Sequence, residues 1–265
     1  MDRTELLFTT DKKKLHKFFL KDPVLYAYHI GDLDDFYFEN CQWAVKYGEG
    51  PFIKETVLIY YGLETPSVIA FGRTELFGSL LESLLDILPG KFFGHYQKPS
   101  ADIFKQRYVE QSLGTHLKMR LDHPERLSEY SVDDPSIVRL EGSQESAIRE
   151  LYAKSYPGNY FDPHMLATGK YVGWFESGRL VAVAGVHANS DEYEIAVLGN
   201  ITTDPGFRGK RLATRLTGVL CRELIDEKKL VCLNVKSDNG PAIRCYENLG
   251  FVKVHEYEEG FFELK

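Results

Sequence analysis

The stretch that most constrains the fold is residues 200–215, where a strand pattern runs through a short turn into a long helix. The residues before the turn favour a strand, and Pro205 fixes the backbone just before the helix. A helix is predicted over residues 208–228 because its apolar side chains repeat at helical spacing. These side chains are Leu212, Leu216, Val219, Leu220 and Leu224. A strand feeding directly into an amphipathic helix predicts an α/β fold in which the helix packs on a sheet.

Cations gather where this helix begins. Arg208, Lys210, Arg211 and Arg215 lie close together in a chain whose net charge is -7. A cation at a helix N-terminus is unfavourable by roughly 0.3–1 kcal/mol, and the first turn also has free backbone N–H groups. Gly209 lets a ligand approach the backbone closely. Against the alternative of an ordinary basic helix start, the cluster predicts a cradle for a pyrophosphate.

A second informative stretch is residues 233–251. Asn239 is a good N-cap, Pro241 suits the first turn and Gly250 suits the end of a helix, so a helix is predicted over residues 241–248. Tyr246 lies one turn beyond the small Ala242, on the same face. A phenol with a pKa of about 10 stays protonated at neutral pH and can donate a proton to a departing thiolate. The alternative is that Tyr246, one of 16 tyrosines, only packs.

These two stretches, in this order, resemble the two signatures of the GNAT family of N-acetyltransferases. The first signature is a proline followed by R/Q-x-x-G-x-G/A, which the chain matches at Pro205, Arg208 and Ala213 but not at Arg211, where the family has glycine. The second is N-x-x-A-x-x-x-Y-x-x-L-G-F, matched at every fixed position from Asn239 to Phe251. The resemblance covers residues 136–265. It implies a GNAT fold of α/β (α+β) class, with a mixed, mostly antiparallel central sheet flanked by helices.

The resemblance also implies a cofactor and a set of site residues. Acetyl-CoA would bind through its pyrophosphate to the turn, through its pantetheine to the strand edge, and near the second helix. The residues implied are Ile201, Thr202, Thr203, Arg208, Gly209, Lys210, Arg211, Leu212, Ala213, Thr214, Asn239, Ala242 and Tyr246. Tyr246 would be the general acid, and the Arg211 guanidinium could contact the phosphates in place of the family's closer backbone.

The general base is less well defined by the sequence. Glu194 is ranked first as a catalytic residue, although it is one residue out of register unless the strand contains a bulge. A chain of water molecules is an equal alternative, and His187 ranks lower. Asn234 occupies a position that some family members use for the base, and an amide cannot accept the proton.

The first half of the chain has its own α/β pattern. Its expected elements are helices 11–20, 74–88 and 100–110 and strands 41–47, 56–61, 67–71, 91–96 and 115–121. Residues 122–135 are polar and contain two prolines, so they are predicted to link a domain at residues 1–121 to one at 136–265. Because the two halves share an order of elements, a duplicated fold with a degenerate, GNAT-like or accessory first half is a hypothesis. In that half the turn 71–76 places the carboxylate of Glu75 where a phosphate would sit.

In the second half, helices are expected at 144–156 and near 163–167. Strands are expected at 137–140, 171–175, 180–188, 194–203, 230–235, 251–254 and 261–264. The four cysteines, Cys41, Cys221, Cys232 and Cys245, form no C-x-x-C pair and read as free thiols. No His/Cys cluster has metal-ligand spacing, so no metal is expected.

Composition narrows the function classes. A chain with net charge -7 is not expected to bind nucleic acid through its phosphates, and an acidic surface favours cationic substrates such as amines. The first residues lack the apolar core of a signal peptide, and no apolar run is long enough to span a membrane. We therefore expect a cytoplasmic acetyl-CoA-dependent N-acetyltransferase acting on a primary amine of a small molecule, an amino acid or a peptide. No membrane partner is expected, and a homodimer is left open. The alternative is a non-catalytic acyl-CoA-binding sensor or regulatory module.

Overall fold

The computed structural model describes residues 6–48, 50–227 and 229–265, and the chain folds into two compact units. Of the described residues, unit 1 holds those up to 118, 236–238 and 255–265, and unit 2 holds those of 119–235 and 239–254. This division differs from the predicted one. The expected linker, residues 122–135, lies inside unit 2 and contains the short 3-10 helix η1 (Pro124–Leu127), and the last residues of the chain belong to unit 1.

Unit 1 contains a mixed sheet with helices on it. Its strands follow the order β1 (Leu7–Phe8), β2 (Cys41–Tyr47), β3 (Ile53–Tyr60), β4 (Ser67–Ala70), β5 (Lys91–Tyr96), β12 (Phe251–Leu264) and β6 (Tyr108–Leu121). Strands β4 and β5 pair in parallel, and β2 with β3, β3 with β4 and β5 with β12 pair antiparallel. The helices are α1 (Lys12–Phe19), α2 (Ala27–Gly31), α3 (Asp35–Phe38), α4 (Leu76–Leu84) and α5 (Lys98–Phe104).

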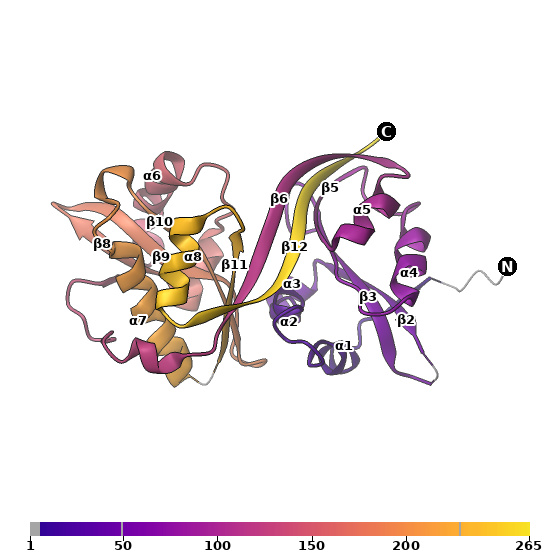
Figure 1. Ribbon diagram of the computed structural model, residues 1–265, viewed down its shortest axis with the longest axis horizontal. Helices are drawn as coiled ribbons and strands as arrows, with labels where there is room; N and C mark the ends of the chain where they lie inside the picture. The colour runs from indigo at the N-terminus through magenta and orange to yellow at the C-terminus, as the bar shows by residue number, and fades with distance from the viewer. Residues whose placement is uncertain (1–5, 49, 228) are drawn as a thin grey trace. The chain divides into compact units, whose positions relative to one another are not determined.

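The C-terminal strand is part of the core of unit 1. Residues 258–263 of β12 pair antiparallel with β5, far from them in sequence (Figure 1). Phe262 is fully buried and stacks on Phe92, with ring centroids 5.0 Å apart, and also contacts Phe104 at 4.9 Å. These rings join the buried leucines of α4 in one apolar cluster. Residues 255–265, at the end of the chain, are therefore part of the fold of unit 1.

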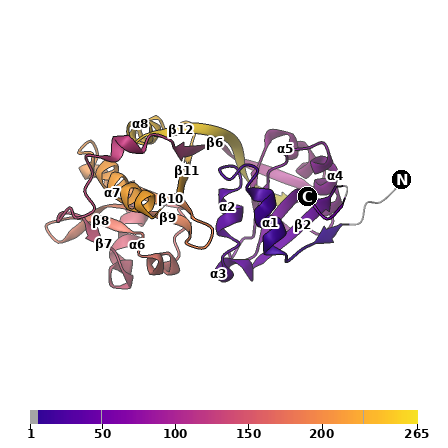
Figure 2. The same cartoon turned by 90° about the horizontal axis from the view of Figure 1, so that it is seen from below.

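Unit 2 contains its own run of neighbouring strands. Its strands follow the order β11 (Leu230–Lys236), β10 (Ile195–Thr203), β9 (Arg179–Ser190), β8 (Val172–Glu176) and β7 (Val138–Arg139). Its helices are α6 (Glu145–Ser155), α7 (Leu212–Asp226) and α8 (Gly240–Asn248), with the 3-10 helices η2 (Gly142–Gln144), η3 (Pro163–Thr168) and η4 (Pro205–Phe207). Figure 2 shows α7 and α8 on one face of this sheet and α6 on the other. The predicted apolar stripe of α7 is buried at all five positions.

The two halves of the chain repeat one order of elements. In each, three consecutive strands lead into a helix, a strand parallel to the third, a second helix and a long final strand. The repeat supports the hypothesis of a duplicated fold.

Several predicted elements need correction. The helix expected at 100–110 ends at Phe104, and β6 begins at Tyr108. The long helix begins at Leu212 rather than at residue 208, so the cations before it lie in a loop. The two final strands are one strand, β12, and the short helices α2 and α3 were not predicted. No helix in the described ranges is long and apolar enough to cross a membrane.

Candidate functional site

The central feature of unit 2 is the separation of its two parallel strands. The β10–β11 ladder starts at the pair Ile195 and Leu230 and ends at the pair Leu198 and Leu233. Both strands continue beyond that pair, β10 to Thr203 and β11 to Lys236. Beyond Leu198 the ladder pairs no backbone group of β10 with β11. Tyr152 donates to the Asn200 carbonyl and Arg208 Nε to that of Thr203, and a ligand entering between the strands could pair with the remaining groups. The predicted pantetheine-binding residues Ile201, Thr202 and Thr203 all lie on this part of β10.

The loop that follows β10 is held by a buried aspartate. Asp204 accepts a hydrogen bond from the N–H of Gly206 (2.9 Å) and pairs with Lys154 at 2.8 Å and Arg179 at 3.4 Å. The hydrogen bond from Lys154 is the main cause that lowers the pKa of this carboxyl. Asp204 is 2% exposed. Its role was not predicted, although the Asp-Pro-Gly sequence is a typical turn signal.

Two left-handed residues shape the rest of the loop. Gly209 has φ of +79°, and an added Cβ there would meet nothing within 4 Å. Arg211, at the position of the family's glycine, has φ of 59° and ψ of 19° and is the N-cap of α7. This conformation is unfavourable for a residue with a Cβ. Alternation of left-handed and other residues turns successive N–H groups toward one side, which is how backbone anion sites form.

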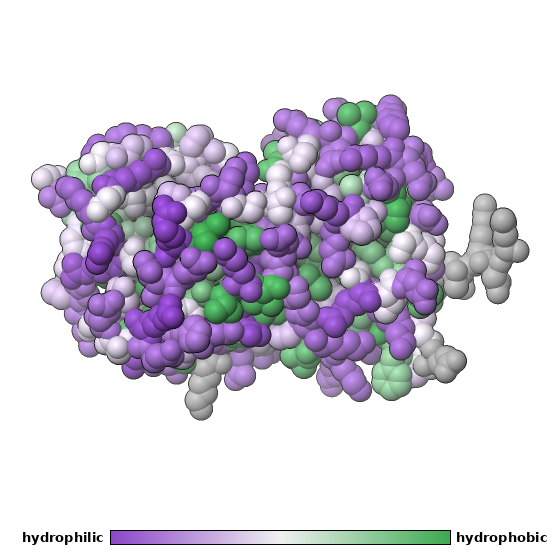
Figure 3. Space-filling view, in the orientation of Figure 1, coloured by the Kyte–Doolittle hydropathy of each residue, from purple (hydrophilic) through white to green (hydrophobic). Residues whose placement is uncertain are grey.

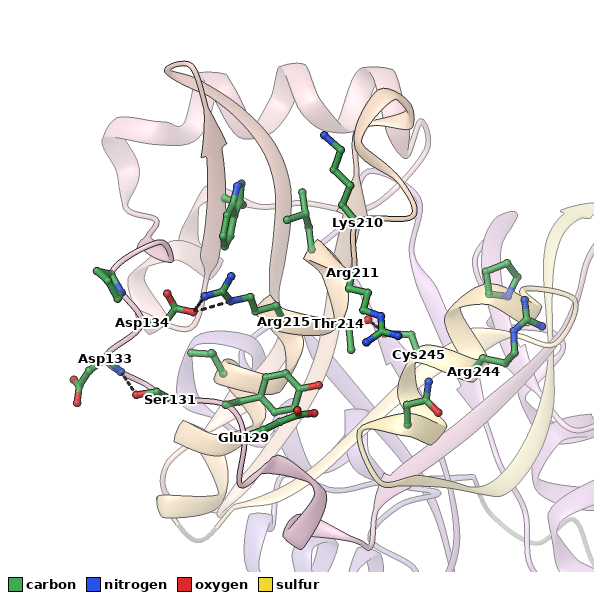
Figure 4. A pocket seen from close by; sticks show the side chains of 17 residues that line it. Glu129, Ser131, Asp133, Asp134, Lys210, Arg211, Thr214, Arg215, Arg244 and Cys245 are labelled. Atoms are coloured by element: carbon green, nitrogen blue, oxygen red, sulfur yellow. Dashed lines mark hydrogen bonds and ion pairs between the residues drawn. The ribbon is translucent and has the colours of Figure 1, made fainter.

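The four cations do not share one role. Arg215 donates from Nε to Asp134 (2.7 Å) and lies over the ring of Trp174, 4.9 Å from its centroid. Arg208, Lys210 and Arg211 are exposed and form no ion pair with a carboxylate of the described residues. Figure 4 shows Arg211 extended toward α8, Arg215 turned to Asp134 and Lys210 pointing away from both. Three cations therefore remain available to an anion at the start of α7.

A groove of about 1160 Å³ opens beside this helix start, within unit 2. It is lined by Glu129, Tyr130, Ser131, Asp133, Asp134, Pro135, Trp174, Lys210, Arg211, Leu212, Thr214, Arg215, Val219, Pro241, Arg244, Cys245 and Asn248. The predicted residues Leu212 and Thr214 belong to this lining, and Thr214 contacts the Cys245 thiol (3.1 Å). The face of unit 2 that bears α7 and α8 is mostly hydrophilic, with smaller hydrophobic areas between (Figure 3).

One wall of the groove is the segment 129–135. Tyr130 packs flat against Gly218 of α7, where an added Cβ would lie 2.6 Å from the ring. A glycine in mid-helix is otherwise unfavourable, by roughly 1 kcal/mol relative to alanine. Gly218 therefore allows the close approach of this wall to α7.

The second predicted motif forms α8 as expected. Asn239 accepts a hydrogen bond from the N–H of Ala242 (3.2 Å), and Tyr246 is 8% exposed, with its ring 6.0 Å from that of Phe251 in a T-shaped contact. Burial raises the pKa of Tyr246 well above 10, with a smaller contribution from Cys245 and from Tyr156 at the end of α6. The hydroxyl therefore carries its proton at neutral pH, as a general acid must.

Glu194 does not lie near the end of the β10–β11 ladder, where the two strands separate. It lies exposed in the turn before β10, with φ of 50°. Four paired residues separate it from the end of the β10–β11 ladder, about 13 Å of strand. Glu194 was predicted to reach the site only if a bulge brought it into register. The bulges of the β9–β10 hairpin lie elsewhere, between Val197 and Leu198 and between Gly199 and Thr202.

A network at the second bulge was missed by the sequence analysis. Asn200 is buried with φ of 57°, and its side chain donates to the Tyr171 hydroxyl (2.8 Å) and accepts from Asn159 (3.4 Å). Tyr152 donates to its carbonyl oxygen (2.9 Å). Asn tolerates the left-handed region better than most residues, but nothing in the local sequence announces the bulge.

The corresponding loop of unit 1 is filled by the protein itself. Both carboxylate oxygens of Glu55, from β3, lie 3.2 Å from the N–H of Arg73, just before α4. Glu55 is fully buried, whereas Glu75 is exposed. The prediction that the turn 71–76 supplies its own carboxylate was therefore wrong: the carboxylate comes from a neighbouring strand. Within the described parts of both units, no group of three His, Cys, Asp or Glu side chains is arranged to hold a metal ion.

Unit 2 thus combines a parallel strand pair that separates with a cationic loop before a helix. Residues 136–251 match the model of the acetyltransferase (GNAT) family, and this part of the chain is a GNAT domain. The predicted GNAT fold is thereby confirmed. Members of this family use acetyl-CoA.

Relatives agree with this assignment. The N-alpha-acetyltransferase RimI of Mycobacterium tuberculosis is 34% identical over 90 residues, a match that spans 32% of this chain and about half (52%) of RimI. A solved Drosophila protein has a TM-score of 0.74 at 15% identity, with 98% of each chain covered. A GNAT-family acetyltransferase of Novosphingobium aromaticivorans has a TM-score of 0.61 at 20% identity, covering 89% of this chain and 96% of its own. The two structures show likeness of fold.

The residues of unit 2 fit acetyl-CoA. The unpaired edge of β10 suits the amides of a pantetheine, and the open backbone at Gly209 suits a pyrophosphate. The three available cations supply the complementary charge.

Proposed function

We propose that the protein is an acetyl-CoA-dependent N-acetyltransferase that transfers acetyl to a primary amine of a small molecule, an amino acid or a peptide. The observation that carries the proposal is the joint presence, in one GNAT domain, of the splayed β10–β11 pair, the cationic loop and the buried, protonated Tyr246. The relative RimI is an N-alpha-acetyltransferase, so peptides with a free α-amine are the first acceptors to test.

The proposed roles follow from position. Ile201, Thr202 and Thr203 would pair with the pantetheine through their backbone, and the loop from Arg208 to Thr214 would hold the pyrophosphate. Once the amine has attacked the thioester carbon, the C–S bond breaks and its electron pair stays on sulfur. Tyr246 would give its proton to that thiolate. Placing the reactants together contributes further, because bound reactants no longer lose translational freedom on meeting.

The second candidate is a non-catalytic acyl-CoA-binding sensor. The position of Glu194, away from the opening, favours it, because an ammonium substrate cannot attack until it loses a proton. Both candidates bind acetyl-CoA, and only the enzyme converts it.

The experiment that tests the proposal is incubation of the purified full chain with acetyl-CoA and a panel of amines. The panel holds free amino acids, polyamines and peptides with free α-amines. Release of coenzyme A is followed through its thiol, and products are identified by mass spectrometry. The proposal expects an amide product and stoichiometric thiol. Binding of acetyl-CoA without acetylation of any amine would favour the sensor.

A further inference from the structure

We infer that His187 is the general base that deprotonates the acceptor amine, an inference that rests on the proposed function. His187 lies on β9, opposite the place where the β10–β11 ladder ends. Its assignment depends on the register of β9 and β10 and on the residues around its ring.

The strand register turns His187 out of the regular alternation. Val197 pairs with Ala188, and the next residue, Leu198, pairs with Val186, so His187 is the extra residue of a bulge in β9. Bulges re-aim a side chain and occur often beside active sites. In the ladder, therefore, His187 does not lie opposite a residue of β10, and its half-buried side chain does not follow the alternation of its neighbours in β9.

Gly199 brings the imidazole to the opening. This residue of β10 is the first beyond the last β10–β11 pair, and it has no side chain between its backbone and His187. An added Cβ on Gly199 would lie 2.8 Å from the His187 Cβ and 3.4 Å from Nδ1. The ring therefore lies directly alongside the backbone at which the two parallel strands separate.

The loop after α6 supports the ring from the other side. Tyr160 meets the imidazole edge to face, with centroids 5.7 Å apart, and its neighbour Asn159 is tied to Asn200 of β10 (3.4 Å). Among these neighbours only Tyr160 is titratable, and Gly199, Asn159 and Asn200 are uncharged. Because α6 and α7 cover opposite faces of the sheet, an amine deprotonated by His187 would approach from the face opposite the cationic loop (Figure 2).

The proton balance is complete with these two residues. The substrate ammonium loses one proton to His187, and its nitrogen lone pair then forms the C–N bond as the C–S bond breaks. The amide nitrogen loses a second proton as the carbonyl is restored. One proton ends on the coenzyme A sulfur by way of Tyr246, and the other leaves to solvent from His187. The products are an amide, coenzyme A thiol and one released proton.

The test compares His187→Gln with His164→Gln, which changes an exposed histidine of η3 in the same unit. The full chain is assayed with acetyl-CoA and the most rapidly acetylated amine of the panel, from about pH 5 to about pH 9, across the ordinary histidine pKa of about 6.5. The wild type and His164→Gln should show kcat/KM rising through an acidic limb. In His187→Gln kcat/KM should fall roughly 10²–10⁴-fold, and its acidic limb should move up to the pKa of the amine itself, about 8 for an α-amine, with KM for acetyl-CoA unchanged.

A second variant separates chemistry from packing. His187→Ala should regain activity with added imidazole but not with pyrrole, which fills the same space and has no basic nitrogen. A His187→Gln variant with the rate and acidic limb of the wild type would overturn the assignment of the base. So would rescue of His187→Ala by pyrrole equal to that by imidazole. Neither result would contradict the proposed acetyltransferase activity. A wild type that acetylates no amine would instead contradict the proposed function, and the role of His187 with it.

Discussion

At the scale of single residues, the site of unit 2 depends on a few side chains whose surroundings set their chemistry. Tyr246 is buried, and burial raises the pKa of its hydroxyl, because removing the proton would leave a phenolate without water around it. The hydroxyl therefore keeps its proton at neutral pH and has one to give when the thiolate departs.

Replacing Tyr246 by Phe should therefore lower kcat by roughly 10²–10⁴-fold, the usual contribution of a positioned acid. Affinity for acetyl-CoA should hardly change, because the ring and its contact with Phe251 remain. Steady-state kinetics and calorimetry on the same preparation measure both effects. Tyr193→Phe, in the turn before β10, serves as the control. Wild-type turnover in Tyr246→Phe would reduce this tyrosine to a packing residue.

Arg211 carries a backbone conformation that favours glycine. Its left-handed φ costs roughly 1–2 kcal/mol for a residue with a Cβ. The free energy of unfolding of Arg211→Gly should therefore exceed that of Arg211→Ala by about 1 kcal/mol, although both variants lose the same charge. Denaturant titration of the two variants measures the difference. An alanine variant as stable as the glycine variant would show that the loop relaxes out of this conformation.

At the scale of elements, local patterns predicted most of what lies within one segment. The N-cap at Asn239, the apolar stripe of α7 and the strands at residues 41–47 and 91–96 follow from capping and periodicity, and the structure has them as predicted. Helices of four or five residues, such as α2 and α3, contain too few turns to show a period.

Features that need two segments were not predictable from one sequence. The bulges that place His187 and Asn200 arise from how β9 pairs with β10, and a pairing register is a property of both strands. The carboxylate before α4 was assigned to the turn itself, whereas Glu55 reaches it from β3. The end of the β10–β11 ladder, which opens the site, is equally a relation between strands.

Glu55 leads to a pH prediction for unit 1. Its burial raises the pKa of the carboxyl, against the hydrogen bonds from Thr74 and Arg73. A raised carboxyl pKa gives a contribution to stability that is fully present below the unfolded pKa of about 4.3 and is lost as pH rises through the folded pKa. Wild type should therefore lose stability relative to Glu55→Gln between about pH 4 and neutrality. Denaturant titrations of both proteins across this range test the sign.

A further comparison checks that Glu55 fills the loop. Glu55→Leu removes the acceptor of the part-buried Arg73 N–H, a loss of about 1 kcal/mol beyond that of the Gln variant, which can still accept it. Equal stability of the Leu and Gln variants would mean that the N–H groups before α4 find another partner.

At the scale of the whole molecule, chain order and folding unit do not coincide. Residues 255–265 follow the GNAT domain in sequence but belong to unit 1, where Phe262 lies in the apolar cluster of α4 and α5. The boundary predicted at residues 122–135 missed this feature. It was drawn from composition, which shows where a segment is polar but not that the last strand pairs with β5.

Phe262→Ala should destabilise unit 1 by about 3–5 kcal/mol, the usual effect of truncating a buried phenylalanine. Amide hydrogen exchange should accelerate most in β4, β5 and α4, with a smaller change in β9 and β10. Leu264→Ala, two residues on and 46% exposed, is the matched control. Faster exchange confined to unit 2 would contradict the place of β12 in the core of unit 1.

Calorimetric titration of the full chain with acetyl-CoA tests the central claim most directly. We expect binding with a Kd on the order of micromolar. Replacing Arg208, Lys210 and Arg211 by Ala should weaken it at least about tenfold, since hydrogen bonds to charged groups contribute roughly 1.5–3 kcal/mol each. The same change at the exposed Lys13, Lys14 and Lys17 of α1 should not. No binding at about millimolar acetyl-CoA, or equal weakening by both triple variants, would show that the loop before α7 does not hold the cofactor.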